Sequence, residues 1–466
     1  MKLPVNEFIR PNSKCYVLAK HVIVIDSISL STGLSRNKTP NICNLADHGM
    51  TCSMVPPFPA VTCPVQATIT TGRYPRDHGI VANGFMDRDN YQVSFWEQSA
   101  RLVRAERIWD LLKNENESLK TAVLFWQNTL FANSDVIVTP KPIHLDKEVV
   151  LWCYSKPVGF YEQISEQIGE FDLASYWGPM ASRKSSEWIT QSAMVTLEKQ
   201  RPNLLLMYLP HIDYSAQKFG PKSVQVDSDI KFADELIGKI VSKTEELGII
   251  KDTIFIILSE YSFNDVRKSV SLNLKLRDSG MLAVRKIKGK EYVDYEHSKA
   301  FAMADHQIAH IYVKHGYIDE VKDALSKVDG VSQILDADRK KQYKIDNSRS
   351  GELVAIADDD CWFNYYWWYD NEDAPAFANN VDIHRKPGYD PLELFFDPRT
   401  KKISMDTSLV KGSHGANINP VTVVVGGSNI NSNINTNQIK IDATQIVPTI
   451  ANIFDVKHNL SNIPIV

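Results

Sequence analysis

The chain has 466 residues, 43% of them hydrophobic, and carries 52 Lys and Arg against 56 Asp and Glu, a formal net charge of −4. This near balance argues against a nucleic acid polymer as partner, because proteins that bind one usually carry a basic excess. The length predicts two units, or one large unit with an inserted cap.

The cysteines and the apolar runs narrow the class of protein further. Six cysteines are scattered without a CxxC pair, which argues against a disulfide framework or a thiolate zinc site. The first 20 residues lack the continuous apolar segment of a secretory signal, and no apolar run approaches the roughly 20 residues of a membrane span. We therefore expect a soluble, cytoplasmic protein with no membrane partner, whose oligomeric state the sequence leaves open. The Asn-rich stretch 427–438 predicts a surface loop.

Three apolar segments each lead into an acidic residue. Segment 21–30 contains Asp26, segment 203–213 ends in Asp213, and segment 252–262 contains Glu260. Continuous β-branched and aliphatic runs are typical of buried parallel strands, and ligands gather where such strands end. The pattern predicts an α/β fold, with a mostly parallel central sheet between helices and an acidic site along one sheet edge. Further elements of this core are predicted as helices over 39–50, 106–114 and 227–247 and a strand over 120–126.

The pattern changes after about residue 285. We predict a small α+β cap over residues 285–399, inserted between the core segments 1–284 and 400–466. An aromatic run over 362–370 is expected to pack between cap and core; the alternative is that it stacks a nucleobase or sugar. The cap is predicted to hold strands over 309–314, 331–336 and 352–357 and a helix over 318–328. The chain is then predicted to return to the core through a strand over 421–427 and a helix over 443–454.

Acids, a hydroxyl and an imidazole together suggest metal-dependent phosphoryl chemistry. Carboxylates and imidazoles bind divalent metals, and a metal-bound hydroxyl becomes a usable nucleophile. Two metals can hold the attacking and leaving oxygens of an in-line displacement at phosphorus. Each residue alone also has an ordinary explanation as a cap, a loop hydroxyl or a turn residue. The residues concerned are Asp26, Thr62, Asp213, Glu260 and His414.

The order of the motifs resembles that of a known family, the nucleotide pyrophosphatase/phosphodiesterase (type I phosphodiesterase) branch of the alkaline phosphatase superfamily. The family's first-strand Asp is matched by 24-VID-26 and its Thr loop by 61-VTCP-64. Its T-G-x-Y-P-x-x-H-G-I segment and the following Asn are matched by 71-TGRYPRDHGIVAN-83. The later motifs are matched in part, by 213-DYSAQKFGP-221, 259-SEY-261 and 412-GSHG-415.

The resemblance implies hydrolysis of a phosphodiester or pyrophosphate bond in a small phosphorylated, nucleotide-type substrate. Thr62 would be the nucleophile of a threonyl-phosphate intermediate, and Asn83 would help to hold the phosphate. Two divalent ions are implied, zinc or alternatively manganese. One would bind Asp26, Thr62 and Glu260, and the other Asp213 and His414, with help from His384 or Gln217. Arg73, Tyr74 and His78 would brace the nucleophile's loop.

Three positions depart from the family pattern. Gln217 and Tyr261 stand where the family has histidines, and Glu260 stands where it has Asp. His306, which follows Asp305, and His384, two residues after Asp382, are candidates to fill the gaps as ligands, unless they are structural histidines. His211 is a weaker candidate. Arg385 and Lys386 are predicted to point at the phosphate, the alternative being solvated surface charges.

Two other classes of function stay open. The first is a phosphomonoester or phosphonate hydrolase on the same fold. The second is a degenerate, non-catalytic relative that binds a ligand, which the missing histidines favour. A sulfatase is rejected, because 62-TCPVQ-66 has Thr in the first position and lacks the Arg of the formylglycine context.

Overall fold

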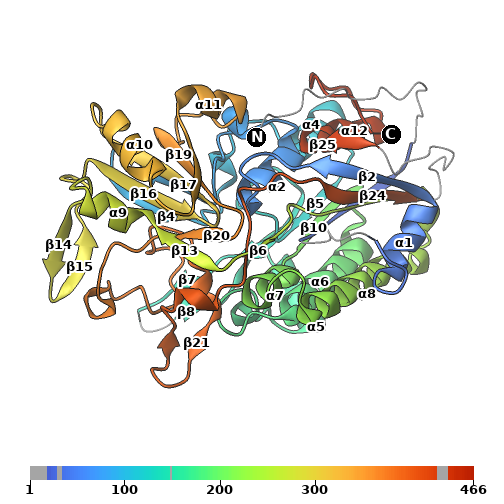
Figure 1. The fold of residues 1–466 in the computed structure, drawn as a ribbon. Helices are drawn as coiled ribbons and strands as arrows, with labels where there is room; N and C mark the ends of the chain where they lie inside the picture. The colour runs from blue at the N-terminus through green and yellow to red at the C-terminus, as the bar shows by residue number, and fades with distance from the viewer. Residues whose placement is uncertain (1–17, 29–33, 147–148, 428–438, 466) are drawn as a thin grey trace.

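The computed structural model describes residues 18–28, 34–146, 149–427 and 439–465. Its main body is a sheet flanked by helices (Figure 1). This sheet has nine strands, in the order β25-β2-β24-β11-β1-β10-β5-β6-β9. This arrangement confirms the predicted α/β class. Apart from Gly427, the predicted Asn-rich loop lies outside the described residues.

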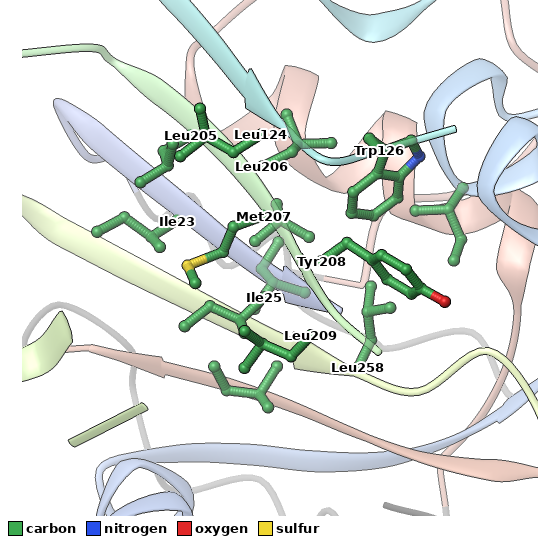
Figure 2. Close-up of a cluster of buried hydrophobic side chains, with 14 of the residues drawn as sticks. Ile23, Ile25, Leu124, Trp126, Leu205, Leu206, Met207, Tyr208, Leu209 and Leu258 are labelled. Carbon is green, nitrogen blue, oxygen red and sulfur yellow. The ribbon is translucent and has the colours of Figure 1, made fainter. Parts of the chain in front are cut away.

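The middle of this sheet is parallel and, apart from the partly buried His21, fully buried. Strand β1 (His21–Ser27) lies between β10 (Leu204–Leu209) and β11 (Thr253–Leu258) and pairs in parallel with both. Side chains such as Ile23 and Met207 pack on the sheet faces (Figure 2), where they are at most 1% exposed. Strands covered on both faces need apolar side chains on both, which is why they appear in the sequence as unbroken apolar runs.

The outer strands mix directions. Strand β24 (Val421–Gly427) returns to the sheet as predicted, but it runs antiparallel to β11 and to β2 (Gly49–Val55). The sequence did not predict β2 or the strands at the far edge. The remaining strands are β25 (Lys440–Asp442), β5 (Thr121–Leu124), β6 (Val136–Pro140) and β9 (Cys153–Lys156). The helices are α1 (Pro40–Asp47), α4 (Ile108–Glu115), α5 (Phe160–Ile168), α6 (Arg183–Gln200), α7 (His211–Phe219), α8 (Val224–Glu246) and α12 (Ile446–Ile453).

A second, four-stranded sheet has its own hydrophobic cluster. The predicted strand–helix–strand–strand run is present, preceded by a strand that the sequence did not predict, β16 (Ala300–Asp305). The cluster also includes side chains from segments 82–95 and 266–282, and the boundary of the cap at 285–399 stays a prediction. The other elements are β17 (Ile308–Val313), β18 (Val331–Leu335), β19 (Leu353–Ala357), α9 (Leu272–Asp278), α10 (Ile318–Ser326) and α11 (Ala337–Gln342).

The aromatic run belongs to this second core. Trp362, Tyr365 and Trp367 are at most 1% exposed, and only Tyr369 is well exposed. Their rings meet edge to face, as between Tyr365 and Trp367 with centroids 6.1 Å apart. The run thus packs as expected, within this second cluster, and its buried rings have no free face on which to stack a nucleobase.

The structure also bears on the disulfide framework and the membrane span that the sequence argued against. The five described cysteines are buried and unpaired. Among the described residues, every helix is too short or too polar to cross a bilayer.

Candidate active site

Thr62 opens helix α2 (Thr62–Thr71) and is buried, as are all ten residues of that helix. The sequence placed Thr62 in a loop, and this was wrong: the extended residue Val61 is the helix N-cap, and helical backbone begins at Thr62 itself. Gly72 ends the helix in the left-handed region, at φ 65°. The positive end of a helix macrodipole therefore lies beside the Thr62 hydroxyl, where it favours an anion.

The segment after α2 holds this helix in place. The Ile80 N–H donates to His78 Nδ1 at 3.1 Å, so His78 Nε2 carries the proton and donates to Thr68 Oγ1 at 3.0 Å. Tyr74 donates to Asp442 at 2.6 Å, across to the strand at the sheet edge. These contacts support the bracing role predicted for Tyr74 and His78. Burial lowers the pKa of His78 to about 3.

This histidine gives a testable pH dependence of stability. His78 binds a proton below pH 6.5 in the unfolded chain but stays neutral in the folded one down to about pH 3. The free energy of unfolding should therefore decrease as the pH is lowered from about 6.5 toward 3, with His78 contributing about 1.4 kcal/mol per pH unit. In His78→Asn, urea unfolding between pH 6.5 and 4.5 should show a shallower pH dependence by about that amount. The exposed His315→Asn is the control, and equal slopes in wild type and His78→Asn would contradict the assignment.

The three predicted acids lie in or shortly after the three central strands, but not all of them stand at a strand end. Asp26 is the second-last residue of β1, and Glu260 follows β11 by two residues. Asp213 lies in the first turn of α7, because β10 ends at Leu209. All three carboxylates are buried. Because β10 and β11 both pair with β1 in parallel, the three acids lie at the same end of the sheet, where these strands finish, as expected.

Asp26 and Glu260 form a pair of buried acids with free oxygens. Among the described residues, Asp26 Oδ1 and both carboxylate oxygens of Glu260 lack a hydrogen-bond partner. Gln66 Nε2 donates to Asp26 Oδ2 at 3.3 Å, and its amide is oriented by the Gln127 N–H, which donates to Gln66 Oε1 at 2.7 Å. Burial raises the pKa of Asp26 to about 7, and burial with the nearby Asp26 charge raises the pKa of Glu260 well above its usual value. Two unsatisfied buried carboxylates are costly alone but suit a divalent cation.

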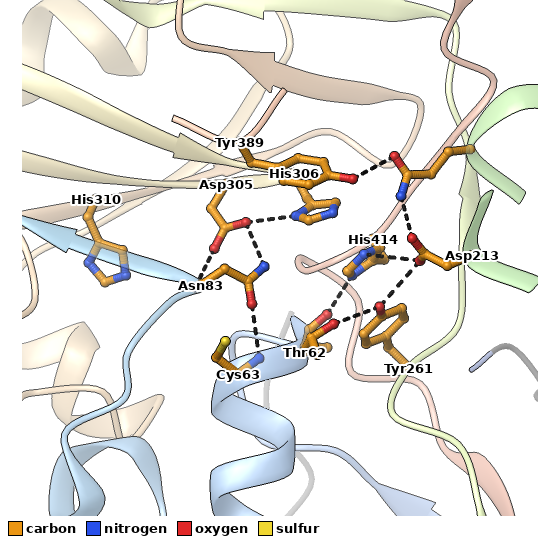
Figure 3. A network of polar contacts seen from close by, with 12 residues as sticks. Thr62, Cys63, Asn83, Asp213, Tyr261, Asp305, His306, His310, Tyr389 and His414 are labelled. Atoms are coloured by element: carbon orange, nitrogen blue, oxygen red, sulfur yellow. Dashed lines mark hydrogen bonds and ion pairs between the residues drawn. The ribbon is translucent and has the colours of Figure 1, made fainter. Parts of the chain in front are cut away.

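Asp213 has a different environment, in which both oxygens accept hydrogen bonds (Figure 3). Gln217 Nε2 donates to Oδ2 at 2.5 Å, and the Tyr261 hydroxyl donates to Oδ1 at 3.3 Å. The same Tyr261 hydroxyl is 3.0 Å from Thr62 Oγ1. Tyr389 donates to Gln217 Oε1 at 2.8 Å and fixes the direction of that amide. Gln217 and Tyr261, which stand where the resemblance leads one to expect histidines, therefore bond to the predicted acid and, through Tyr261, to the predicted nucleophile.

Two neutral imidazoles lie above this network (Figure 3). His414 Nδ1 donates to the Ala60 carbonyl at 2.8 Å, which leaves Nε2 unprotonated, 3.9 Å from Asp213 Oδ1 and without a hydrogen-bond partner in the described chain. His306 Nδ1 donates to Asp305 Oδ1 at 2.7 Å, and its ring centroid is 4.0 Å from that of His414. Burial lowers the pKa of both imidazoles well below the usual value. A carboxylate behind an imidazole is the usual support of a metal ligand.

Asn83 is held by the same carboxylate. Its backbone N–H donates to Asp305 Oδ2 at 2.8 Å and its Nδ2 to Asp305 Oδ1 at 3.1 Å, while its Oδ1 accepts from the Cys63 N–H at 2.9 Å. One N–H of the Asn83 amide is left for a ligand. The sequence missed Asp305 as the anchor of Asn83; the adjacent Asp305-His306 pair was the available signal.

The structure does not bring the other predicted residues into this group. His384 is exposed. Arg385 forms an ion pair with Asp382, three residues away. Lys386 is neither a phosphate ligand nor a solvated charge: it is 1% exposed and pairs with two buried acids, Asp390 at 2.8 Å and Glu393 at 2.7 Å.

The weaker candidate His211 is also committed elsewhere. Its two ring nitrogens bond to Ser186 Oγ at 2.7 Å and to the Asp229 carbonyl at 3.0 Å. Tyr389, which donates a hydrogen bond to Gln217, was not predicted as a site residue. Nothing in segment 382–391 of the sequence indicates that Tyr389 contacts Gln217.

Comparison with known proteins gives one family. The family model described as type I phosphodiesterase/nucleotide pyrophosphatase matches residues 21–390. An uncharacterised pyrophosphatase/phosphodiesterase of Schizosaccharomyces pombe is 27% identical over 241 residues, which are 49% of this chain and 41% of that protein. Ectonucleotide pyrophosphatase/phosphodiesterase 2 of Saccharomyces cerevisiae is 23% identical over 327 residues, 68% of this chain and 57% of its own. The chain thus spans about half the length of these curated relatives.

Solved structures share the fold. Human ectonucleotide pyrophosphatase/phosphodiesterase 5 has a TM-score of 0.59 at 15% identity, covering 95% of this chain and 97% of its own. An inactive variant of the murine protein, solved in complex with AMP, has a TM-score of 0.58 at 16% identity, covering 94% of this chain and 96% of its own.

Proposed function

The chain belongs to the type I phosphodiesterase/nucleotide pyrophosphatase family, and from this premise we propose that it hydrolyses a phosphodiester or pyrophosphate bond through a threonyl-phosphate intermediate. One observation carries the proposal: the Thr62 hydroxyl stands at the N-terminus of a buried helix, among buried carboxylate and imidazole atoms that have no partner within the described residues. A metal-assisted attack on phosphorus needs this combination of a hydroxyl and free ligand atoms.

The roles follow from the contacts. Thr62 Oγ1 forms a bond to phosphorus as the bond from phosphorus to the leaving oxygen breaks, and water then hydrolyses the threonyl ester. The Thr62 hydroxyl proton passes to Tyr261 as Tyr261 passes its own proton to Asp213, along the two hydrogen bonds that join these residues. The free N–H of Asn83 and the positive end of α2 stabilise the charge on the phosphate oxygens in the transition state.

Divalent metal fits the donors that are present. The residues that would hold it are Asp26, Thr62 and Glu260 in one group and Asp213, His414 and His306 in another. When bound, metal supplies positive charge opposite the phosphate oxygens and lowers the pKa of the Thr62 hydroxyl. His384, Arg385 and Lys386 have no part in the proposal, for the reasons of placement given above.

The substrate proposed is a small nucleotide. The AMP in the murine relative supports this class, and the chain retains the Thr62 and Asn83 positions of the family motif. As predicted from the sequence, we propose that the chain binds neither a nucleic acid polymer nor a membrane and that it is located in the cytoplasm. The rival phosphomonoester or phosphonate activity is tested by comparing kcat/KM for bis(4-nitrophenyl) phosphate, 4-nitrophenyl phosphate and 4-nitrophenyl phenylphosphonate. We expect the diester to be preferred by at least about tenfold, and a preferred monoester or phosphonate would replace the proposal.

The donor set also predicts the metal response. The candidate ligands Asp26, Glu260 and Thr62 all offer oxygen. Oxygen ligands suit harder ions such as Mn²⁺, so we do not expect this site to be selective for Zn²⁺. Diesterase activity should therefore disappear on exhaustive chelation and return with added Mn²⁺ as well as with Zn²⁺. Titration of the chelated protein with each ion, followed by the diester assay, checks this. Recovery with Zn²⁺ alone would contradict the harder donor set.

One observation favours the second candidate, a non-catalytic binder: both oxygens of Asp213 are occupied by Gln217 and Tyr261. Elemental analysis of the purified and metal-reconstituted chain separates the two functions. A chain that retains no ion after reconstitution and shows no turnover would be a binder. Retained ion with metal-dependent turnover supports the hydrolase.

A further inference from the structure

The ligand atoms of the site fall into two halves that differ in their hydrogen bonding. In the first half, Asp26 Oδ1 and both oxygens of Glu260 are buried and free among the described residues. Burying two acids side by side without a cation is costly, because their charged forms lose water and repel each other. A bound cation would remove that cost by bonding to the free oxygens. The first half is thus built for an ion.

The second half is already satisfied by neutral donors. Asp213 Oδ2 accepts from Gln217 Nε2 at 2.5 Å and Asp213 Oδ1 from the Tyr261 hydroxyl at 3.3 Å. The Gln217 amide cannot turn its oxygen toward Asp213 without breaking the 2.8 Å bond from Tyr389. An amide N–H donates and has no lone pair for a metal. Each oxygen of this carboxylate therefore already accepts a hydrogen bond from a neutral donor that is held in place.

Tyr261 is fixed in this position from several sides. Its ring stacks on that of His414, with centroids 3.6 Å apart and planes 7° from parallel, and meets Phe263 edge to face at 5.9 Å. Its hydroxyl lies 3.0 Å from Thr62 Oγ1 while it donates to Asp213. Because the hydroxyl has a single proton, Thr62 is the donor in the first of these contacts. Two hydrogen bonds of the Tyr261 hydroxyl thus link the proposed nucleophile, Thr62, to Asp213.

What remains for an ion in the second half is sparse. His414 Nε2 has its lone pair free and lies 3.9 Å from Asp213 Oδ1, the oxygen that already accepts from Tyr261. Zinc sites in proteins use three or four protein ligands. His306 Nε2 is unprotonated as well, because Nδ1 donates to Asp305. Two imidazoles, beside a carboxylate that is already bonded to Gln217 and Tyr261, fall short of that number.

We propose that this chain holds one tightly bound divalent ion, at Asp26 and Glu260 beside Thr62, and that the bonded chain Tyr261–Asp213–Gln217 stands in place of a second. The inference rests on the proposed function and narrows the two ions predicted from the sequence to one. Tyr261 is then a positioning residue for Thr62.

Native mass spectrometry of the full chain tests the proposal by counting ions, independently of activity. Protein loaded with Zn²⁺ and desalted should carry one ion in the wild type, one in Asp213→Asn and none in Glu260→Gln. A two-ion site would instead give two, one and one. The remote Tyr312→Phe, which loses a buried hydroxyl contact to the Arg349 carbonyl, is the control and should match the wild type.

A gain of function completes the test. Gln217→His combined with Tyr261→His removes both donors from Asp213 and adds two imidazoles, so the count should rise from one ion to two. Two ions in the wild type would overturn the inference and leave the proposed hydrolase intact. No ion in any form, at saturating Zn²⁺ and with all variants folded by circular dichroism, would overturn both. If the double variant does not fold, the wild-type, Asp213→Asn and Glu260→Gln counts still decide.

Discussion

Replacing Thr62 by Ala is expected to lower kcat for a phosphodiester by about a thousandfold or more, because the variant has no oxygen to form the intermediate. Thr62 makes one side-chain hydrogen bond, to Tyr261, so its loss should leave the fold in place. Thr62→Ser keeps the hydroxyl and should retain a measurable part of the rate. The measurement is steady-state hydrolysis of bis(4-nitrophenyl) phosphate at saturating metal.

A matched control for this variant is available within the same helix. Thr70 is buried in α2, and its hydroxyl bonds only to carbonyls of its own helix, at 2.6 Å to that of Gln66 and 3.3 Å to that of Ala67. Thr70→Ala should therefore keep its kcat within about a factor of a few. Wild-type turnover in Thr62→Ala would remove the proposed nucleophile, and an equal loss in both variants would attribute the effect to the helix instead.

Glu260→Gln is expected to have opposite effects on catalysis and on stability. With metal supplied, loss of the carboxylate should lower kcat/KM by about a hundredfold or more, since a ligand of the ion is replaced by a weak neutral donor. In the presence of chelator, the same change should raise Tm by up to a few degrees. It removes one of two neighbouring buried acids that have no compensating cation.

Parallel assays and thermal melts, each with and without chelator, measure both effects. The exposed Glu320→Gln, on α10, is the control and should change neither quantity. If Glu260→Gln destabilises the chelated protein, the two acids are not in electrostatic conflict and the argument for an ion between them is lost.

The central fold could be predicted because buried parallel strands have an unmistakable composition. Strands β1, β10 and β11 are apolar on both faces and stood out at once. Strand β2 did not, because Thr51 and Ser53 interrupt its apolar residues near the sheet edge. Antiparallel pairing of β24 was likewise hidden, since strand direction depends on the path of the chain and not on local composition.

The candidate site was predictable where the signal lies in a short motif. Asp26, Thr62, Asn83, Glu260 and His414 were all named from local patterns, and the structure places each of them in the buried group. Contacts between residues that are far apart in the sequence could not be predicted in this way. The bond from Tyr389 to Gln217 joins residues 172 apart, and that from Thr62 to Tyr261 joins residues 199 apart.

Such contacts explain the errors as well. Gln217 and Tyr261 looked like losses when only their inability to replace histidine was considered; their value as hydrogen-bond donors to Asp213 appears only in three dimensions. His384 looked like a replacement ligand because it follows Asp382, yet Asp382 pairs with Arg385 and the histidine faces outward. Lys386 was expected near phosphate and instead neutralises two buried acids.

The stereochemical course at phosphorus tests the central claim most directly. A covalent intermediate on Thr62 requires two successive in-line displacements, each of which inverts the phosphorus centre. Hydrolysis of one diastereomer of a nucleoside phosphorothioate diester in ¹⁸O-labelled water, with metal supplied, should therefore proceed with net retention of configuration. Net inversion would mean that water attacks directly and that Thr62 never bonds to phosphorus, and the absence of any turnover by the metal-loaded chain would contradict the hydrolase itself.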